Sequence, residues 1–560
     1  MTDSEKMATM LNEFFCSVFT EEDTTSLPEV EQLFEGTDPL VSIEFLPTNI
    51  EKKLKELKPS SAPGPDKLWP RVLHSLADVL CFPLALIFSR CLSEGTVPPE
   101  WKRANITPIF KKGSKGSPGN YRPVSLTCII CKVMESLLRD EIVSHLARHQ
   151  LIHDTQHGFT SGRSCLTNLL EYLEELTKLM DTGKSVDIVY LDFAKAFDKV
   201  PIRRLLAKCA GLGIQGDLLA WIGEWLSGRE QRVVLNGKAS SWENVRSGVP
   251  QGSVLGPTLF LIFINDIDSA VNVTGSVLEK FADDTKWAMV VECDEDRVIF
   301  QEGLDKLMEW SVEWQMLFNV DKCHIIHAGL KNKGYEYTMG GRILKEVDHE
   351  KDVGVLLHRS FRPGLQCAKA AQKGNMVLGQ LCRGVSYRDR DTFMGLYTTF
   401  VRPHLEYCSQ AWSPWTQGDK EVLEAVQRRA VGMVTNLKGK VYEERLSELG
   451  MVTLEERRRR GDLVQMYKVL TQKDKVDYTR WFELAHPRSG AASTRSISGS
   501  LNVVQNEGRN LLRKNFWSVR VCEPWNSLPD TVKLQTSTNS FKNSLDNFIS
   551  GMKKRQTSYM

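Results

Sequence analysis

With 560 residues, 41% of them hydrophobic, the chain is long enough to form several domains with buried cores. Its thirteen cysteines are spread singly, and no apolar run approaches the roughly 18 to 20 residues of a membrane span. These features argue against a disulfide framework and a membrane protein, and they indicate a reducing intracellular compartment. The net charge is only +2, but residues 1–50 contain eleven acidic residues and one lysine, so the rest of the chain carries +12.

The N-terminal third contains an acidic segment followed by a basic one. Residues 1–50 form an acidic, partly helical segment, and the Pro-, Ser- and Gly-rich stretch at residues 59–66 is a loop by composition. Between Trp101 and Arg122 there are six Lys or Arg residues and no acid. This Gly-, Ser- and Pro-rich stretch could reach a phosphate backbone or a triphosphate, which favours a nucleic-acid partner.

Further along the chain, one carboxylate follows a predicted strand. Residues 186–191 alternate in a way that predicts a buried strand, and Asp192 comes directly after it. A side chain at a strand end is held rigidly, as a ligand or a catalytic group requires. Asp192 is therefore a candidate for either role.

Asp283 and Asp284 are adjacent carboxylates in a predicted strand-turn-strand segment, although its turn lacks glycine. Most such pairs are solvated turn residues. However, adjacent carboxylates repel, and Mg²⁺ prefers carboxylate oxygens and substrate phosphates as ligands. Two such ions close together can activate a 3′-hydroxyl and stabilise a leaving pyrophosphate. Together with Asp192, the pair predicts a metal-dependent nucleotidyltransferase.

The C-terminal part has a helical rather than a strand-like pattern. Strand alternation ends at residue 357, and residues 358 to about 480 predict helices. Within them, residues 457–460 are four consecutive arginines, which predict either a nucleic-acid contact or a solvated helix face. The role of the tail that follows does not emerge from its residues.

Five motifs in a fixed order make the chain resemble the reverse transcriptases of non-LTR (LINE-type) retrotransposons, most closely the jockey-like branch. They lie at residues 106–126, 156–164, 191–200, 248–257 and 281–284. The chain departs from many relatives at His157 and Ile202, where an aromatic residue and a histidine are usual. Neither position is a metal ligand in the family, so the expected chemistry is unchanged.

The resemblance implies an α+β fold of the right-hand polymerase type, with fingers, a palm of antiparallel strands and a helical thumb. The expected divisions are an acidic N-terminal connector at 1–50, a fingers extension at 51–91, fingers and palm at 92–357, a thumb at 358–480 and a C-terminal segment of unknown role at 481–560.

It also implies the chemistry of the site. Asp192, Asp283 and Asp284, with the backbone carbonyl of Phe193, are expected to bind two Mg²⁺ ions, for which Mn²⁺ could substitute. Lys322 matches a lysine of the family and is expected to act as general acid; the alternative is an exposed loop lysine.

Other residues are assigned to substrates by the same resemblance. Arg122 is expected to contact the incoming triphosphate, since a guanidinium suits phosphate oxygens, and Gln251 and Gly252 to shape the nucleotide pocket. Phe197 would lie under the sugar and exclude a 2′-hydroxyl, or else be a core aromatic. Gly354 is expected in the primer grip, where glycine allows close backbone approach.

The expected function is RNA-directed DNA polymerisation that copies element RNA from the 3′-hydroxyl of a nicked target. Template RNA, primer DNA and dNTPs are the expected partners, with no membrane, in the nucleus and cytoplasm. Family members usually carry an endonuclease domain ahead of the polymerase, so endonuclease activity is expected to come from elsewhere. The alternatives are a decayed nucleic-acid-binding relic and another palm polymerase, such as an intron maturase or a viral RNA polymerase.

Overall fold

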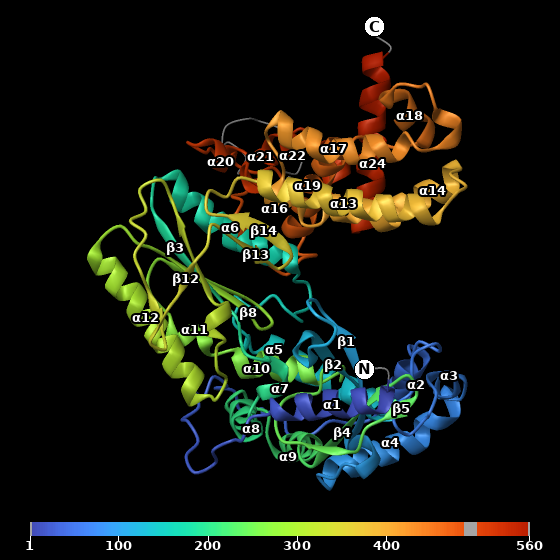
Figure 1. The fold of residues 1–560 in the computed structure, drawn as a ribbon, viewed down its shortest axis with the longest axis vertical. Helices are drawn as coiled ribbons and strands as arrows, with labels where there is room; N and C mark the ends of the chain where they lie inside the picture. The colour runs from blue at the N-terminus through green and yellow to red at the C-terminus, as the bar shows by residue number, and fades with distance from the viewer. Residues whose placement is uncertain (1–2, 486–500, 558–560) are drawn as a thin grey trace, which may run out of the picture.

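The structure is a computed structural model that describes residues 3–485 and 501–557. It has a central β-sheet with a lobe at each end (Figure 1). We call residues 3–164 and 193–275 the lower lobe, and residues 349–485 and 501–557 the upper lobe. The mixed helix and strand content agrees with the predicted α+β class. Within the described residues, every helix is too short or too polar to span a bilayer.

The central sheet has five strands, and both of its faces are buried. In sheet order they are β12 (Lys345–Glu346), β9 (His324–Ala328), β3 (Val186–Leu191), β8 (Asp284–Val290) and β7 (Ser276–Phe281). All neighbours are antiparallel except β12 and β9. Helix α6 (Cys165–Asp181) covers one face, and α10 (Gly256–Ile264) with α12 (Asp294–Glu313) covers the other.

Strand β3 lies in the middle of this sheet, as its alternating sequence predicts. Ile188 packs toward α6, and the next residue, Val189, packs into the core on the opposite face. Both side chains are fully buried. The predicted strand at residues 186–191 is therefore confirmed, and Asp192 follows its last residue.

Strands β7 and β8 form a tight hairpin in which Phe281 pairs with Asp284. Only Ala282 and Asp283 remain for the turn, and Ala282 has a left-handed φ of 57°. A two-residue hairpin turn requires positive φ at one or both central positions, which glycine usually supplies. The predicted strand-turn-strand is confirmed, with alanine in the position that glycine would favour.

The lower lobe contains a second sheet, in the order β2, β1, β4, β5, with β6 also paired to β4. Its strands are β1 (Arg103–Phe110), β2 (Tyr121–Leu126), β4 (Arg229–Leu235), β5 (Lys238–Ala239) and β6 (Glu243–Val245). Helix α1 (Ser4–Ser17) packs Leu11 and Phe15 against this sheet. Residues 18–46 then continue along the lobe in extended form, and Glu22 accepts hydrogen bonds from the backbone N–H groups of Arg203 and Arg204.

Helices complete the lower lobe. They are α2 (Pro47–Lys55), α3 (Pro70–Ser75), α4 (Ala77–Ser93), α5 (Ile129–Arg148), α7 (Ala196–Lys199), α8 (Ile202–Gly211), α9 (Gly216–Leu226) and α11 (Ile267–Ala270), with 3₁₀ turns η1 (Pro99–Lys102) and η2 (Pro118–Asn120). Turn η3 (Val320–Lys322), β10 (Thr338–Met339) and β11 (Arg342–Ile343) lie beside the central sheet.

The upper lobe begins with the hairpin of β13 (His349–Asp352) and β14 (Val355–His358) and is otherwise helical. Its longer helices are α13 (Gly364–Gly384), α17 (Gln417–Val431), α18 (Tyr442–Leu449), α19 (Leu454–Leu470) and α24 (Thr538–Thr557). The shorter elements are α14 (Arg390–Leu396), the π-helical turn η4 (Tyr397–Val401), α15 (Arg402–Glu406), α16 (Ser409–Trp412), η5 (Thr435–Leu437), η6 (Tyr478–Arg480), α20 (Leu511–Lys514), α21 (Trp517–Arg520), α22 (Cys522–Asn526) and α23 (Asp530–Lys533).

The C-terminal residues from 501 onward share the core of this lobe. Trp517 and Trp525 are fully buried there. The Arg513 guanidinium lies 2.6 Å from Glu174 of α6, and both side chains are buried. The Ser518 hydroxyl donates a second 2.6 Å hydrogen bond to the same carboxylate. Helix α6 is therefore attached to the upper lobe by a desolvated ion pair.

This ion pair leads to a prediction. We expect Glu174→Gln to lower the free energy of unfolding by roughly 3 kcal/mol, because it leaves a buried guanidinium without its counter-charge. Denaturant unfolding of both proteins measures the difference. Glu175→Gln is the control, since Glu175 pairs with Lys178 at the surface and such pairs contribute about 0 to 1 kcal/mol. Equal losses in the two variants would contradict the prediction.

Candidate active site

The predicted site residues meet where the central sheet ends toward the lower lobe. Asp192 follows β3, Asp284 begins β8, and Lys322 precedes β9. They line a cavity of about 150 Å³, together with Glu350 and Asp352 of β13. Asp283 occupies the hairpin turn, within electrostatic reach of Asp192.

Desolvation and neighbouring carboxylates raise the pKa values of Asp283 and Asp284. Partial desolvation and the negative charge of Asp192 raise the pKa of Asp283. Desolvation, followed by the charges of Asp283, Asp352 and Asp192, raises the pKa of Asp284 to about 6. Each shift means that the ionised form is disfavoured until positive charge arrives. This is the electrostatic environment expected of residues that could hold a cation.

Lys322 provides one positive charge next to the carboxylates. Its Nζ lies 2.9 Å from Oδ2 of Asp192, and the side chains are 61% and 39% exposed. An ion pair so open to water contributes little stability and can separate easily. Lys322 therefore lies within the site, as predicted, and is not confined to one partner.

Phe193 anchors the backbone beside Asp192. Its ring is buried and stacks on Phe318 at 4.4 Å. The backbone N–H of Asn319 donates to the Asp192 carbonyl at 2.7 Å, and that of Ala194 donates to the Leu317 carbonyl at 3.1 Å. Asp192 and Ala194, the residues on either side of Phe193, thus make these two backbone hydrogen bonds, and the Phe193 carbonyl takes part in neither.

Three further cations of the lower lobe lie near the site: Arg122 and Lys111 act on Asp283, while the Lys195 ammonium lies over the Phe14 ring. Arg122 is exposed on β2, with its charge acting on Asp283. Desolvation and the nearby charge of Arg122 lower the pKa of Lys111. Desolvation, and then repulsion from Lys322 and Arg122, does the same for Lys195. The sequence reasoning assigned no role to Lys111 and Lys195 individually; the basic stretch between Trp101 and Arg122 was the available signal for Lys111.

Phe197 lies behind this group of cations, on α7. Its ring stacks on the buried Phe260 at 4.5 Å, and the exposed Phe159 meets it edge-on at 6.2 Å. Phe197 itself is only partly buried. One face of the ring therefore packs in the core, and the ring is also partly accessible. This arrangement is compatible with both predicted alternatives, a core aromatic and a ring under the nucleotide sugar.

Gln251 and Gly252 lie where the loop before α10 crosses β2. The Gln251 backbone carbonyl accepts a hydrogen bond from the Ser125 N–H at 2.7 Å, and the Gln251 side-chain amide donates to the Asp198 carboxylate at 3.1 Å. Gly252 has a φ of 113°, and a Cβ there would come within 2.7 Å of the Ser125 carbonyl. Only glycine fits so close to β2, so this pair holds the loop against the strand that carries Arg122.

A residue without a predicted role fixes the turn that carries Asp283. The Gln156 carboxamide accepts from the backbone N–H of Ala282 at 2.9 Å and donates to its carbonyl at 3.4 Å. It also accepts from the N–H of Gly158 at 2.8 Å. A Cβ on Gly158 would lie 2.2 Å from the Ala282 nitrogen. The motif at residues 156–159 contains both residues, but their partner lies over 120 positions away, so spacing alone could not reveal the contact.

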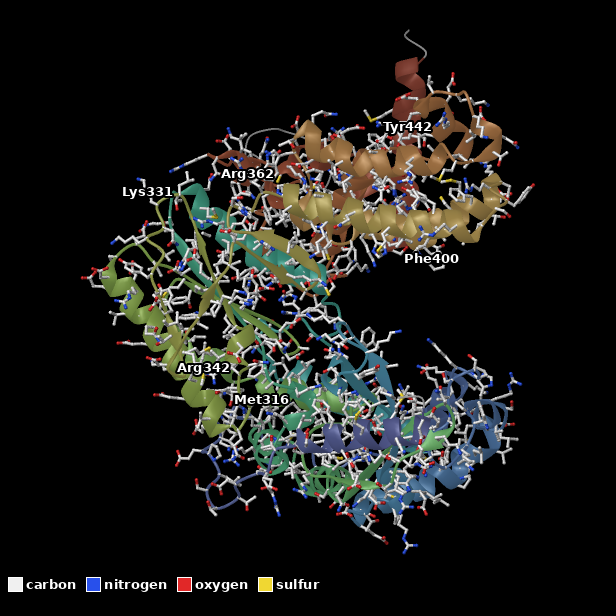
Figure 2. All side chains as sticks on the ribbon, viewed as in Figure 1. Met316, Lys331, Arg342, Arg362, Phe400 and Tyr442 are labelled. Atoms are coloured by element: carbon white, nitrogen blue, oxygen red, sulfur yellow. The ribbon has the colours of Figure 1, made fainter. Side chains whose placement is uncertain are left out.

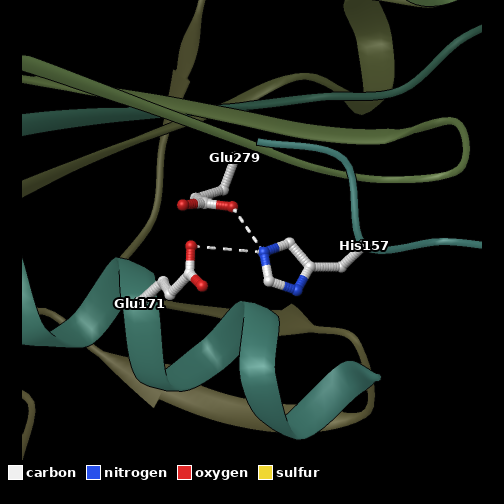
Figure 3. A group of neighbouring side chains, drawn as sticks. All are labelled: His157, Glu171 and Glu279. Atoms are coloured by element: carbon white, nitrogen blue, oxygen red, sulfur yellow. Dashed lines mark ion pairs between the residues drawn. The ribbon is translucent and has the colours of Figure 1, made fainter. Parts of the chain in front are cut away.

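His157 connects the same loop to a buried group of charges. Its Nε2 lies 3.4 Å from one oxygen of Glu171 and 3.4 Å from one of Glu279 (Figure 3). Its Nδ1 is 2.8 Å from the Thr167 hydroxyl. Burial alone would lower the pKa of His157, but the two carboxylates outweigh it and raise that pKa.

The three side chains have the composition of a small metal site, but their neighbours already supply positive charge. Arg480 donates to Glu171 at 3.2 Å. Lys286 is within electrostatic reach of Glu279 and contacts Asp352 at 2.5 Å. A protonated His157 gives this chain of groups equal numbers of positive and negative charges. We therefore interpret the group as an ion-pair network that extends from the upper lobe to the cavity.

Gly354 lies in the two-residue turn between β13 and β14, with a φ of 98°. A Cβ on it would meet the Tyr407 ring at 3.0 Å. The Tyr407 hydroxyl donates to the Val353 carbonyl at 2.8 Å. The glycine thus allows the hairpin turn to pack closely against the Tyr407 ring. Its expected contact with a primer stays a prediction.

We expect Gly158→Ala to lower the predicted nucleotidyl transfer by about a hundredfold, because the turn that carries Asp283 must move to admit the methyl group. Primer-extension rates measure the effect, and melting temperatures show whether the fold survives. Gly379→Ala is the control, since Gly379 lies within α13 and has open space around its Cα. Unchanged extension by the Gly158 variant would mean that the turn tolerates displacement.

A second prediction concerns pH. Because the folded-state pKa of His157 is raised, its charge stabilises the fold below the ordinary histidine range, and this contribution is lost as pH rises through the raised pKa. The melting temperature of wild type should therefore exceed that of His157→Gln most at pH values near 6 and least near 9. His349→Gln, at an exposed position on β13, should show no such trend. A constant difference between wild type and the His157 variant would indicate a neutral imidazole.

Comparison with known proteins adds to this geometry. Residues 109–356 match the family described as reverse transcriptase (RNA-dependent DNA polymerase). The chain is 29% identical over 377 residues to the RNA-directed DNA polymerase from mobile element jockey of Drosophila funebris, covering 65% of this chain and 41% of the relative. The corresponding jockey polymerase of Drosophila melanogaster is 28% identical over 397 residues, or 68% and 43% of the two chains.

The probable RNA-directed DNA polymerase from transposon X-element of Drosophila melanogaster is 25% identical over 433 residues, which cover 73% of this chain and 46% of the relative. The chain therefore spans less than half the length of these relatives. Every predicted site residue, from Arg122 to Gly354, lies within the matched region. The resemblance to jockey-like polymerases is confirmed, and residues 109–356 match the reverse transcriptase family.

Proposed function

We propose that the chain is an RNA-directed DNA polymerase that extends a primer 3′-hydroxyl on an RNA template. The observation that carries this proposal is the meeting of Asp192, Asp283 and Asp284 at one end of a buried sheet, inside a reverse transcriptase domain. An intact carboxylate set argues against a decayed relic.

The right-hand arrangement follows from the same proposal. The lower lobe would act as the fingers, the central sheet as the palm and the helical upper lobe as the thumb, with boundaries near residues 92 and 358. The C-terminal segment from 481 would then be part of the thumb, because its tryptophans share the core of that lobe. Residues 1–50 would support the fingers from outside.

The donor chemistry of the site fits Mg²⁺, which prefers oxygen ligands. Asp192, Asp283 and Asp284 would hold the ions, and the Phe193 carbonyl would add a backbone oxygen. When bound, the two ions would activate the 3′-hydroxyl and neutralise charge on the triphosphate. The raised pKa values of Asp283 and Asp284 support this assignment, since a bound cation would offset both the desolvation and the carboxylate repulsion that cause them.

The cations of the lower lobe would bind the triphosphate. Arg122 offers a planar guanidinium that matches phosphate oxygens, while Lys111 and Lys195 offer point charges. Their lowered lysine pKa values support this, because a polyanion between them would replace mutual repulsion by attraction. Lys322, on the opposite side, would donate a proton to the departing pyrophosphate.

Selection of the sugar would fall to Phe197. Its ring is fixed against Phe260, so it could not turn aside for a 2′-hydroxyl on the incoming nucleotide. Gln251 and Gly252 would keep the pocket floor in place, because they hold the loop against β2.

The underside of the upper lobe would contact the duplex. Lys369 and Lys373 are exposed one turn apart on α13, where two cations can follow a phosphate backbone. Phe400, which is exposed, lies on the side of this lobe that faces the lower lobe (Figure 2). The turn at Gly354 would hold the primer end. We further propose that element RNA and a nicked target are the natural substrates, with the nick made by an endonuclease supplied elsewhere.

One assay tests the function. A poly(rA) template, an oligo(dT) primer and Mg²⁺ are combined with either dTTP or UTP. Incorporation of dTTP alone supports the proposal. Incorporation of UTP would indicate another palm polymerase, and template binding without incorporation of either nucleotide would indicate a relic.

The carboxylate assignment gives a sharper prediction. We expect Asp283→Asn to reduce incorporation by roughly a hundredfold or more, because it removes a ligand charge at the step of chemistry. RNA binding should be nearly unchanged, since it depends on Lys and Arg contacts elsewhere. Asp321→Asn is the matched control, because Asp321 is an exposed acid beside Lys322 that pairs with Arg342. A comparable extension rate for Asp283→Asn would refute the assignment.

A further inference from the structure

The outer face of α3 and α4 carries the densest group of exposed apolar side chains in the described parts of the chain. It consists of Leu68, Trp69, Val72, Leu76, Val79, Phe82, Leu86 and Ile87, which are between 40% and 75% exposed. We call this set the α4 face. Its helices lie at the edge of the lower lobe, away from the central sheet (Figure 1).

The inner side of the same helix is equally apolar. Cys81, Leu84 and Phe88 of α4 are buried in the main core. A helix that is hydrophobic all round is normally buried all round. Helix α4 therefore has the composition of a fully buried helix, but its outer side is exposed in the single chain.

The size of this face is that of a protein interface. Trp69 and Phe82, which are 54% and 63% exposed, present roughly 80 to 160 Å² each, and six aliphatic side chains add to this area. The largest apolar patch on a typical monomer is about 300 to 600 Å². A standard interface buries about 800 Å² per partner.

The charges at the ends of the face are self-complementary. Asp78, Phe82, Leu86 and Arg90 follow one another at four-residue intervals along α4, and so lie on one ridge of the helix. An antiparallel pair of α4 helices centred between Phe82 and Leu86 would bring Phe82 of each copy beside Leu86 of the other. The same register would bring Asp78 of each copy to the end where the partner's Arg90 lies. Arg90 already contacts Glu94 at 2.7 Å at the surface, where it is free to share its charge.

We propose that the α4 face is a homodimer interface in which two α4 helices pack antiparallel about a two-fold axis. A two-fold interface requires a surface that complements itself, and this ridge does so in both its apolar centre and its charged ends. The dimer would leave the cleft between the lobes of each copy open, because the α4 face lies at the far edge of the lower lobe.

Sedimentation equilibrium or light scattering of the full 560-residue chain tests the proposal. Wild type should have twice the mass of the 63.5 kDa monomer at micromolar concentration. Leu86→Arg should yield folded monomers, since Leu86 is 75% exposed in the single chain and its replacement leaves the core intact. Val298→Arg, at an exposed apolar position on α12, should leave the dimer intact.

A charge swap tests the register. Asp78→Lys and Arg90→Glu should each weaken the dimer by about tenfold, because each places like charges together at both ends of the interface. The double variant should recover most of the affinity. A monomeric wild type, or a dimer that Leu86→Arg does not affect, would overturn the proposal. Failure of the double variant to recover would overturn the antiparallel register.

Discussion

The site depends on one strained turn. Two adjacent carboxylates can point toward a common ligand only if the chain reverses within two residues, and this reversal places Ala282 at a positive φ that alanine disfavours. Such a residue costs about 1 to 3 kcal/mol unless its surroundings fix it. Gln156 does so by bonding both polar groups of the Ala282 backbone. Gly158 allows the loop to come close enough for those bonds.

Helix α6 carries this support to the rest of the molecule. Its apolar residues pack on the sheet and on the upper lobe, while Glu171 and Glu174, three residues apart on the helix, place buried charge against Arg480 and Arg513 of that lobe. Desolvated ion pairs are weak evidence for stability, but breaking one is expensive. Their effect here is on geometry, because they allow few arrangements of α6 relative to His157 and Arg513. The position of the turn at Ala282 and Asp283 is thereby tied to the packing of the upper lobe.

Local patterns were enough to predict β3, the hairpin at Asp283 and the helical upper lobe, because each depends on residues near one another in the chain. The partners of Gln156, His157 and Arg513 could not be predicted, since they are set by how distant segments pack. The arginine run at 457–460 illustrates the limit. In the structure Arg457, Arg459 and Arg460 pair with acids and Arg458 is buried, so this run serves the packing of the lobe. Composition could not separate these roles.

The charges of the site explain why it suits a ligand of mixed charge. Desolvation, followed by the charge of neighbouring carboxylates, raises the pKa values of Asp283 and Asp284, whereas desolvation and nearby cations lower those of Lys111 and Lys195. The acids and the bases share one cleft, and Lys322 already pairs with Asp192 at 2.9 Å, while the pKa shifts of the other groups persist. A metal ion satisfies the first set and a triphosphate the second, and a metal–nucleotide complex satisfies both at once, which is the substrate form that the proposed reaction uses.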